Sequence, residues 1–356
     1  MNSKTISNGA GAFLTALITM TNSYAVLPAS GAGRGIWISD IASLILALVL
    51  AYFFTSSCDT FPDETFYGVL RKSTGKWGAA VLGGVFVLLT LLTAVVSLTV
   101  FSRFVQITAL PRTPQIIIPF ILIVIAALSL SGELTASGGA ATLLFWFSAF
   151  VFILFAVSGI FNAEPRLFLL PREGFSEILT GAGEVFLNRF APLPALMAVY
   201  TRMSERKTRR KYFLGSLTGA GVALALIGAL TVTTLGEKLS ETDFYPVYTA
   251  MSIHSVGGFI QHTEIFACIA MTVSLFFKGT VSLMFSEDMI NGIFGVERRA
   301  GNALPIALIA AASTQLIYTS ISSLRGLLEW KNGATAMLLI NIAIPLLLFV
   351  KSRRTN

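Results

Sequence analysis

The stretch "AFLTALITMTNSYAVLP", residues 12–28, decides the fold class. It is apolar and long enough to enter a bilayer, whose hydrocarbon core takes roughly 20 apolar residues as a helix. Near its middle it carries Thr21, Asn22 and Ser23, whose side chains compete with a helix for backbone hydrogen bonds. We therefore expect a membrane-spanning helix that is interrupted at this triplet.

The composition extends this expectation to the whole chain. Of its 356 residues, 54% are hydrophobic and only 12% are charged, whereas about a quarter of a soluble domain is charged. Only helices and closed barrels span a bilayer. Apolar and polar residues alternate with period two along a barrel strand, whereas these runs are apolar on all sides. The sequence predicts an all-α integral membrane protein with a single transmembrane domain over residues 1–356.

The hydrophobic runs between charged, Pro and Gly clusters predict ten spans. They cover approximately 10–28, 36–54, 78–108, 115–131, 141–161, 178–200, 213–235, 261–290, 303–324 and 333–350. Ten spans divide into five plus five, so the second half enters the membrane from the opposite side, as in an inverted repeat. We place the first repeat at about 10–161 and the second at about 178–350.

Basic residues set the expected orientation. With the N-terminus inside, the inner side collects 15 of the 25 Lys and Arg residues, the outer side 8, and Arg189 and Lys278 fall within spans. The excess of cations on one side predicts that both termini are cytoplasmic. The basic loop "TRMSERKTRRK", residues 201–211, is then an anchor at the lipid bilayer, and no nucleic acid is expected as a partner.

The sixth span has its own interruption, at "APLP" (191–194). Pro192 and Pro194 lack the N–H that a helix needs, so a regular ladder is not expected around Ala191 to Ala195. Interrupted helices at corresponding places in two halves indicate a substrate site. The predicted substrate-binding residues are therefore Thr21, Asn22, Ser23, Pro192, Leu193, Pro194 and Ala195. The alternative for the Thr21 to Ser23 triplet is a helix–helix contact through small polar side chains.

Ionisable and hydroxyl residues inside other spans complete the predicted site. Lys278 lies within the long eighth span, where an ammonium is costly unless paired. We expect it to take the place of a coupled cation, with carbonyls near Thr21 to Ser23 as partners, or else to snorkel to the inner face. Thr93 and Ser97 either line the cavity or bond back onto their own helix. Glu184 and Arg189 form an ion pair or stay near the outer interface.

Two other motifs could suggest a phosphate-binding or a metal-binding site, but neither has the sequence context that such a site needs. "GAGRG" (31–35) is not preceded by a strand, so it is no phosphate loop. His254 and His262 have no supporting acids or cysteines, and we predict no metal, no cofactor and no catalytic residues. The protein is not expected to be an enzyme.

Several short stretches together resemble the spore germination permease family, the B subunits of nutrient germinant receptors. They are "VLP" (26–28), "WIS" (37–39), "GKW" (75–77), "RTP" (112–114), the basic loop after the sixth span, and "YPVYTAMSIHSVGGFIQHTEIF" (245–266). This family belongs to the amino acid/polyamine/organocation transporter superfamily, so the resemblance implies a LeuT-like fold with broken helices 1 and 6. The chain departs from the family at both interruptions: "TNS" replaces a glycine-containing sequence, and "PLPA" replaces a Gly-x-Glu.

The resemblance implies a sensing subunit in the spore inner membrane. It would bind a small-molecule germinant, such as an amino acid, and signal to an A-type membrane subunit and a C-type lipoprotein. The alternatives are a proton- or cation-coupled amino acid transporter that uses Lys278, and a structural or channel-forming component without its own ligand.

Overall fold

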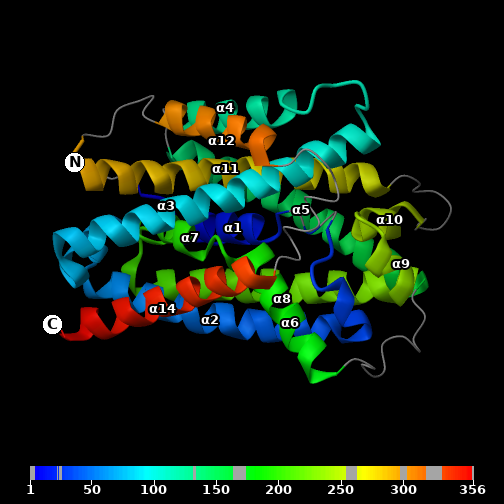
Figure 1. The fold of residues 1–356 in the computed structure, drawn as a ribbon, viewed down its shortest axis with the longest axis horizontal. Helices are drawn as coiled ribbons and strands as arrows, with labels where there is room; N and C mark the ends of the chain where they lie inside the picture. The colour runs from blue at the N-terminus through cyan, green and yellow to red at the C-terminus, as the bar shows by residue number, and fades with distance from the viewer. Residues whose placement is uncertain are drawn as a thin grey trace.

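The computed structural model describes residues 5–21, 23, 26–130, 134–162, 174–253, 263–296, 303–317 and 331–354. These residues form an all-helical bundle (Figure 1). The helices are α1 (Asn8–Thr19), α2 (Ile36–Thr60), α3 (Phe66–Thr108), α4 (Ile117–Ser129), α5 (Leu134–Asn162), α6 (Phe175–Val185), α7 (Leu193–Tyr200), α8 (Arg206–Leu235), α9 (Glu237–Thr242), α10 (Pro246–Ile253), α11 (Thr263–Phe294), α12 (Ala303–Ile317) and α14 (Lys331–Arg354). A 3₁₀ segment η1 (Ser30–Gly35) precedes α2, and a π-helical segment η3 (Phe186–Phe190) joins α6 to α7.

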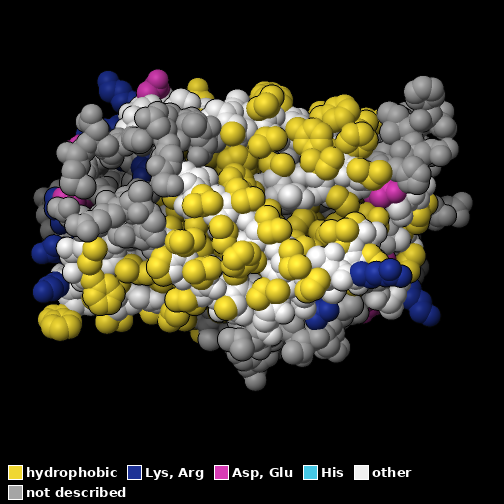
Figure 2. All heavy atoms as spheres, turned by 90° about the horizontal axis from the view of Figure 1, so that it is seen from above, with side chains coloured by type: hydrophobic (Ala, Val, Ile, Leu, Met, Phe, Trp, Pro, Cys, Tyr) yellow, Lys and Arg dark blue, Asp and Glu magenta, His cyan; other side chains and the backbone are white. Residues whose placement is uncertain are grey.

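Five of the described helices are long and apolar enough to cross a membrane. They contain residues 31–60, 66–108, 138–160, 206–235 and 264–294, and shorter apolar helices lie at Asn8–Thr19, Ile117–Ser129 and Ala303–Gln315. The all-helical membrane architecture is therefore confirmed, while the count of ten spans stays a prediction. Figure 2 shows hydrophobic side chains across the middle of one face and charged side chains toward the two ends, as a bilayer requires.

α3 consists of a short first part and the long third span, which meet at a kink at Gly75. α3 begins at Phe66, where the Thr65 hydroxyl accepts from the Gly68 N–H, and it passes Gly75 at φ +76° and ψ 175°. Only glycine adopts that backbone readily, and because it is not helical, Gly75 breaks the helix and turns the chain. Residues 66–74, expected in an inner loop, therefore form a short helix before the kink, and the membrane-spanning part of α3 follows it.

Both ends of the described chain lie at the same end of the bundle. The Ile6 N–H donates to the Arg202 carbonyl (3.0 Å), and the Ser204 N–H donates to the Ile6 carbonyl (3.0 Å), at the loop that opens α8. At the other terminus, Ser352 lies with its hydroxyl 3.5 Å from that of Ser57, near the end of α2. This placement agrees with an even number of membrane crossings.

The long helices pack in two groups around α1 (Figure 1). The first group consists of α1, α2, α6, η3, α7 and α8, with α2 and α1 both packed along α8. The second group consists of α3, α4, α11 and α12, with α3 packed along α11 and α4 against α12. α1 also touches α5, α7 and α11, so its C-terminal end lies where the two groups meet.

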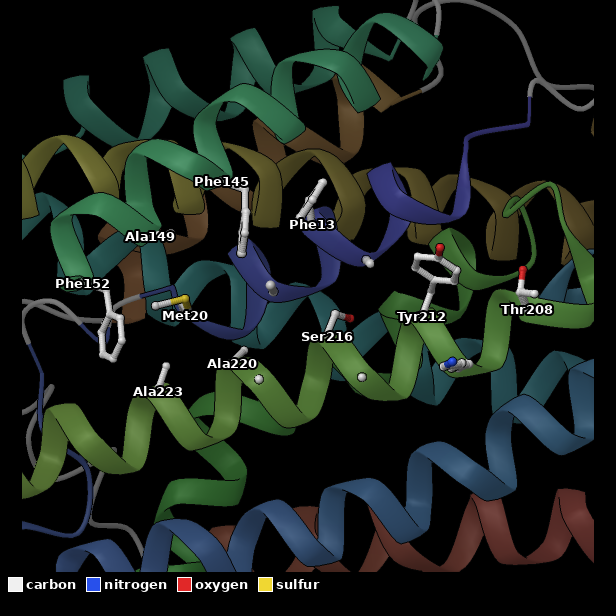
Figure 3. A pocket seen from close by; sticks show the side chains of 15 residues that line it. Phe13, Met20, Phe145, Ala149, Phe152, Thr208, Tyr212, Ser216, Ala220 and Ala223 are labelled. Atoms are coloured by element: carbon white, nitrogen blue, oxygen red, sulfur yellow. The ribbon is translucent and has the colours of Figure 1, made fainter.

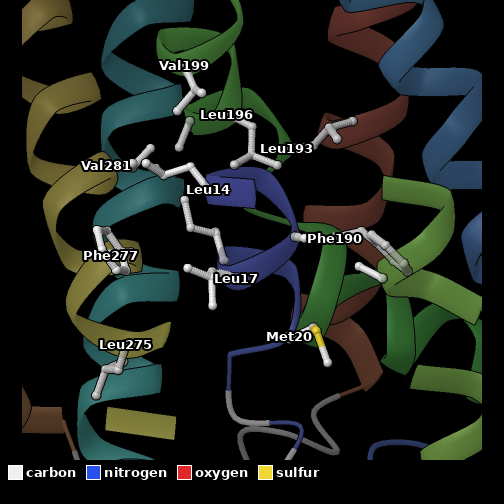
Figure 4. Close-up of a cluster of buried hydrophobic side chains, with 14 of the residues drawn as sticks. Leu14, Leu17, Met20, Phe190, Leu193, Leu196, Val199, Leu275, Phe277 and Val281 are labelled. Carbon is white, nitrogen blue, oxygen red and sulfur yellow. The ribbon is translucent and has the colours of Figure 1, made fainter. Parts of the chain in front are cut away.

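The core around α1 is apolar. Leu14 and Leu17 of α1 face Leu193 and Leu196 of α7 on one side and Phe277 of α11 on the other (Figure 4). All five side chains are at most 5% exposed. Hydrophobic packing therefore holds the second half of α1 in place, and polar contacts begin at Thr21, just after the helix ends.

Candidate functional site

The interruption after α1 and the irregular turn η3 of the sixth span lie next to the same small cavity. α1 ends at Thr19, Met20 caps it, and Thr21 and Ser23 lie in turns. α6 ends at Val185 and is followed by η3, in which the Ala191 N–H bonds to the carbonyl of Phe186, five residues back. π-helical turns of this kind are frequent at functional sites.

The prolines of the sixth span lie differently from the prediction. The irregular backbone is at Phe186–Pro192, and Leu193, Pro194 and Ala195 already belong to α7. Pro is tolerated in the first turn of a helix, because the N–H groups there have no intrahelical partner. Pro192 caps α7 and Pro194 lies in its first turn. Of these four predicted binding residues, Leu193 and Ala195 pack in the apolar core, each 1% exposed.

The cavity between the interruptions is very small. It has a volume of about 10 Å³ and is lined by Thr21, Ser23, Val26, Pro28, Val100, Asn188 and Arg189. A volume of about 10–15 Å³ holds one water molecule, whereas small-molecule pockets measure roughly 300–1,000 Å³. A nutrient-sized ligand therefore needs the surrounding helices to move apart.

Thr21 and Ser23 present polar atoms at this cavity. The Thr21 hydroxyl lies 3.3 Å from the carbonyls of both Leu17 and Ser274, so it touches α11 as well as its own helix. The Ser23 hydroxyl is buried and has no hydrogen-bond partner among the described residues. Asn22, the middle residue of the predicted triplet, lies outside the described residues.

Arg189 is the charged residue in the described lining of the cavity. Its guanidinium donates from Nη1 to Asp40 Oδ1 of α2 at 2.5 Å, and the two side chains are only 2% and 1% exposed. Arg189 Nε and Nη2, and Asp40 Oδ2, are buried without a partner in the described part of the chain. Such orphaned polar atoms are costly and are a common sign of a functional site. The Asn188 amide donates to the Glu184 carbonyl, so this turn is also tied to α6.

This pairing differs from the expected one, in which Arg189 was to bind Glu184 or stay near the outer interface. Arg189 faces the bundle interior instead, and it forms its ion pair with Asp40. Asp40 was missed although a signal existed, since it is the only acid in the predicted span 36–54. An acid inside an apolar span is a functional candidate by default.

Lys278 is buried within the second group of helices. It is 2% exposed, so it does not snorkel, and its Nζ donates to the Ser97 hydroxyl of α3 at 2.5 Å. Within the described residues Lys278 makes no ion pair. Its partner is therefore Ser97 and not a carbonyl near Thr21 to Ser23, although Ser274, one turn earlier on α11, does contact Thr21.

The two hydroxyl residues of α3 differ in their contacts. Ser97 receives the Lys278 hydrogen bond and donates to the Thr93 carbonyl (2.8 Å), while Thr93 bonds only back onto its helix, at the Thr90 carbonyl (2.9 Å). Neither residue lines the small cavity, to which α3 contributes Val100. The described residues contain no cluster of three His, Cys, Asp or Glu that could hold a metal.

Comparison with known proteins identifies the family of this chain. The family model described as "Spore germination protein" matches residues 5–324. The chain belongs to this family of spore germination permeases. It is 21% identical over 300 residues to spore germination protein KB of Bacillus subtilis (strain 168), a match that covers 82% of this chain and 79% of that protein.

Solved structures of transporters share the fold. The manganese transporter of Eremococcus coleocola aligns with a TM-score of 0.60 at 14% identity, over 96% of this chain and 78% of the other. MHP1, a nucleobase-cation-symport-1 family transporter in a closed conformation with bromovinylhydantoin bound, aligns with a TM-score of 0.59 at 13% identity, over 94% and 76% of the two chains. This protein is therefore a multi-pass membrane protein of the spore germination family with a transporter fold, and it is not an enzyme.

Proposed function

We propose that this protein is the nutrient-sensing subunit of a germinant receptor and binds a small molecule between the interrupted helices. The observation that carries the proposal is the buried guanidinium of Arg189, which lines the cavity with two unused donor groups. Arg offers a planar fork that suits a carboxylate. We therefore expect the ligand to be an amino acid or a similar molecule with a carboxylate or another strong acceptor.

Binding at this place couples directly to a conformational change. Because the cavity has room for about one water, the ligand can enter only if the two groups of helices separate around the end of α1. A ligand with higher affinity for the separated state shifts the population toward it. We propose that an A-type membrane subunit and a C-type lipoprotein detect this shift, in the spore inner membrane and with both termini of this chain cytoplasmic.

The test uses spores that carry the whole receptor and a panel of amino acids and sugars. Ser23→Phe fills the cavity and Arg189→Lys removes the planar fork while keeping the charge, so both are expected to lose the germination response to the active nutrient. Thr93→Phe serves as the matched control, since Thr93 does not line the cavity. With equal amounts of protein in the membrane, a normal response of both cavity variants would show that the ligand binds elsewhere.

A cation-coupled amino acid transporter is the second candidate, because Lys278 is a buried cation that donates a hydrogen bond to Ser97 and has no counterion among the described residues. That function predicts saturable uptake by liposomes that contain this chain alone, and uptake would exclude a pure sensor. The manganese of the Eremococcus coleocola transporter does not fit this site. The cavity lining as described contains the cation Arg189 and no carboxylate, and this positive charge repels a metal ion.

A further inference from the structure

A second and much larger cavity lies between α1, α5 and α8 (Figure 3). Its volume is about 670 Å³, and it shares no lining residue with the central cavity. Phe13 and Phe145 point into it from α1 and α5, and small residues of α8 line the opposite side (Figure 3). We call this space the α8 groove; its lining residues on α8 are Thr208, Lys211, Tyr212, Gly215, Ser216, Gly219, Ala220 and Ala223.

The groove exists because the face of α8 that lines it carries glycine and other small residues in its middle part. Gly215 and Gly219 are one turn apart, and a Cβ added to either would meet no atom within 4 Å. The opposite wall is held by aromatic contact, since the rings of Phe13 and Phe145 stack with centroids 4.6 Å apart. An open groove between firmly packed walls can accept an occupant without rearrangement.

The surface around the groove faces hydrocarbon. Leu143 and Trp146 of α5 are 73% and 61% exposed, and Val222 of α8 is 52% exposed. Side chains of this kind on the outside of a membrane bundle contact lipid tails. The medium next to the groove is therefore acyl chains, which can enter from the side.

The dimensions favour a chain over a helix. From Thr208 to Ala223 the groove follows α8 for about 22 Å, at 1.5 Å per residue, and its volume gives a mean cross-section of about 30 Å². A helix about 10 Å wide needs roughly 80 Å². One leaflet of a bilayer contributes about 15 Å of hydrocarbon, so the groove is long enough for one acyl chain.

One end of the groove carries a cation that the protein itself does not neutralise. Lys211 is exposed and makes no ion pair within the described residues, whereas Arg209 and Arg210 bind Asp59 and Arg206 binds Asp63. Basic pockets between membrane helices bind anionic head groups. The hydroxyls of Thr208 and Tyr212 line the same end and provide further hydrogen-bonding groups for a phosphate.

We propose that the α8 groove binds one anionic phospholipid, with an acyl chain along Gly215 and Gly219 and the phosphate at Lys211. Since α8 packs along both α1 and α2, a lipid in this groove contacts the group of helices that carries the interrupted α1. The membrane's anionic lipid thus becomes a ligand of the protein.

The test measures lipid bound to the purified full chain by native mass spectrometry, with phosphatidylglycerol and phosphatidylcholine of identical acyl chains as probes. The wild type should retain phosphatidylglycerol preferentially. Gly219→Leu should lower the occupancy of both lipids at least tenfold, and Lys211→Gln should lower only that of phosphatidylglycerol, about fivefold. The matched controls are Gly84→Leu, a helical glycine with open space on α3, and Lys207→Gln, a neighbouring exposed cation outside the groove.

Two results would overturn the proposal. In one, Gly219→Leu and a second groove-filling variant, Ala223→Phe, bind phosphatidylglycerol like the wild type while melting at the wild-type temperature. In the other, these variants keep the lipid but no longer copurify with a coexpressed partner subunit, which would make the groove a protein interface. Equal retention of both lipids by the wild type would remove the role of Lys211.

Discussion

The buried ion pair between Asp40 and Arg189 gives the sharpest prediction about stability. Asp40→Asn keeps the shape of the side chain next to Gly228 but leaves the Arg189 charge, 2% exposed, without its counterion. Removing one partner of a buried pair costs about 3–5 kcal/mol. At ~2 °C per kcal/mol for a large chain, the melting temperature should fall by roughly 6–10 °C.

The assay is intrinsic tryptophan fluorescence during heating of the detergent-solubilised protein, with a double-mutant cycle. Arg189→Met in the Asp40→Asn background removes the remaining charge and should restore most of the lost stability. The control is Asp63→Asn. Asp63 forms an ion pair with Arg206, and the two side chains are 80% and 55% exposed, so this pair should contribute about 0–1 kcal/mol to stability. If Asp40→Asn lowers the melting temperature no more than Asp63→Asn does, the burial argument is wrong.

Three further substitutions test other parts of the structure. Lys278→Met should raise the melting temperature by a few degrees, because it removes an unpaired buried charge, and should abolish the germination response; a response like that of the wild type would give Lys278 no functional role. Gly292→Ala places a Cβ 2.3 Å from the Tyr67 ring and should cost about 1–3 kcal/mol in chemical unfolding, whereas an unchanged midpoint would mean that the ring moves aside. Asp59→Asn weakens hydrogen bonds from two arginines and a tyrosine at 28% exposure and should cost about 1–3 kcal/mol; a heat-scan difference within error would count against that network.

The interruption of the first helix was predictable because its cause is local. Thr21 and Ser23 follow the last helical residue, Thr19, by a few positions, and polar side chains that compete for backbone hydrogen bonds are visible in one sequence. The burial of Lys278 was also predictable from local sequence, since this lysine lies in the middle of a long apolar run that forms a membrane helix.

The irregular turn of the sixth span was located only approximately. Pro192 and Pro194 indicated a disturbed helix, but a proline can open a helix as readily as it ends one, and here α7 starts at Leu193. The π-helical bonding of Phe186–Phe190 has no periodic signature in the sequence. The partner of Arg189 was not predictable by proximity, since Asp40 lies 149 positions away and reaches it only through the packing of α2 against η3.

The polar contacts divide between the two groups of helices in a way that indicates how the site opens. Asp40 with Arg189 lies within the first group, and Lys278 with Ser97 lies within the second. Between the groups, Thr21 touches the Ser274 carbonyl at 3.3 Å, and Arg202 pairs with Asp288 of α11 at 2.6 Å near the basic end. If a ligand enters by separating the groups, the bonds that break are these last two, while the two buried cations keep their partners and each group moves as a unit. The Arg189 donors that remain unused in the closed state are then the ones available to the ligand.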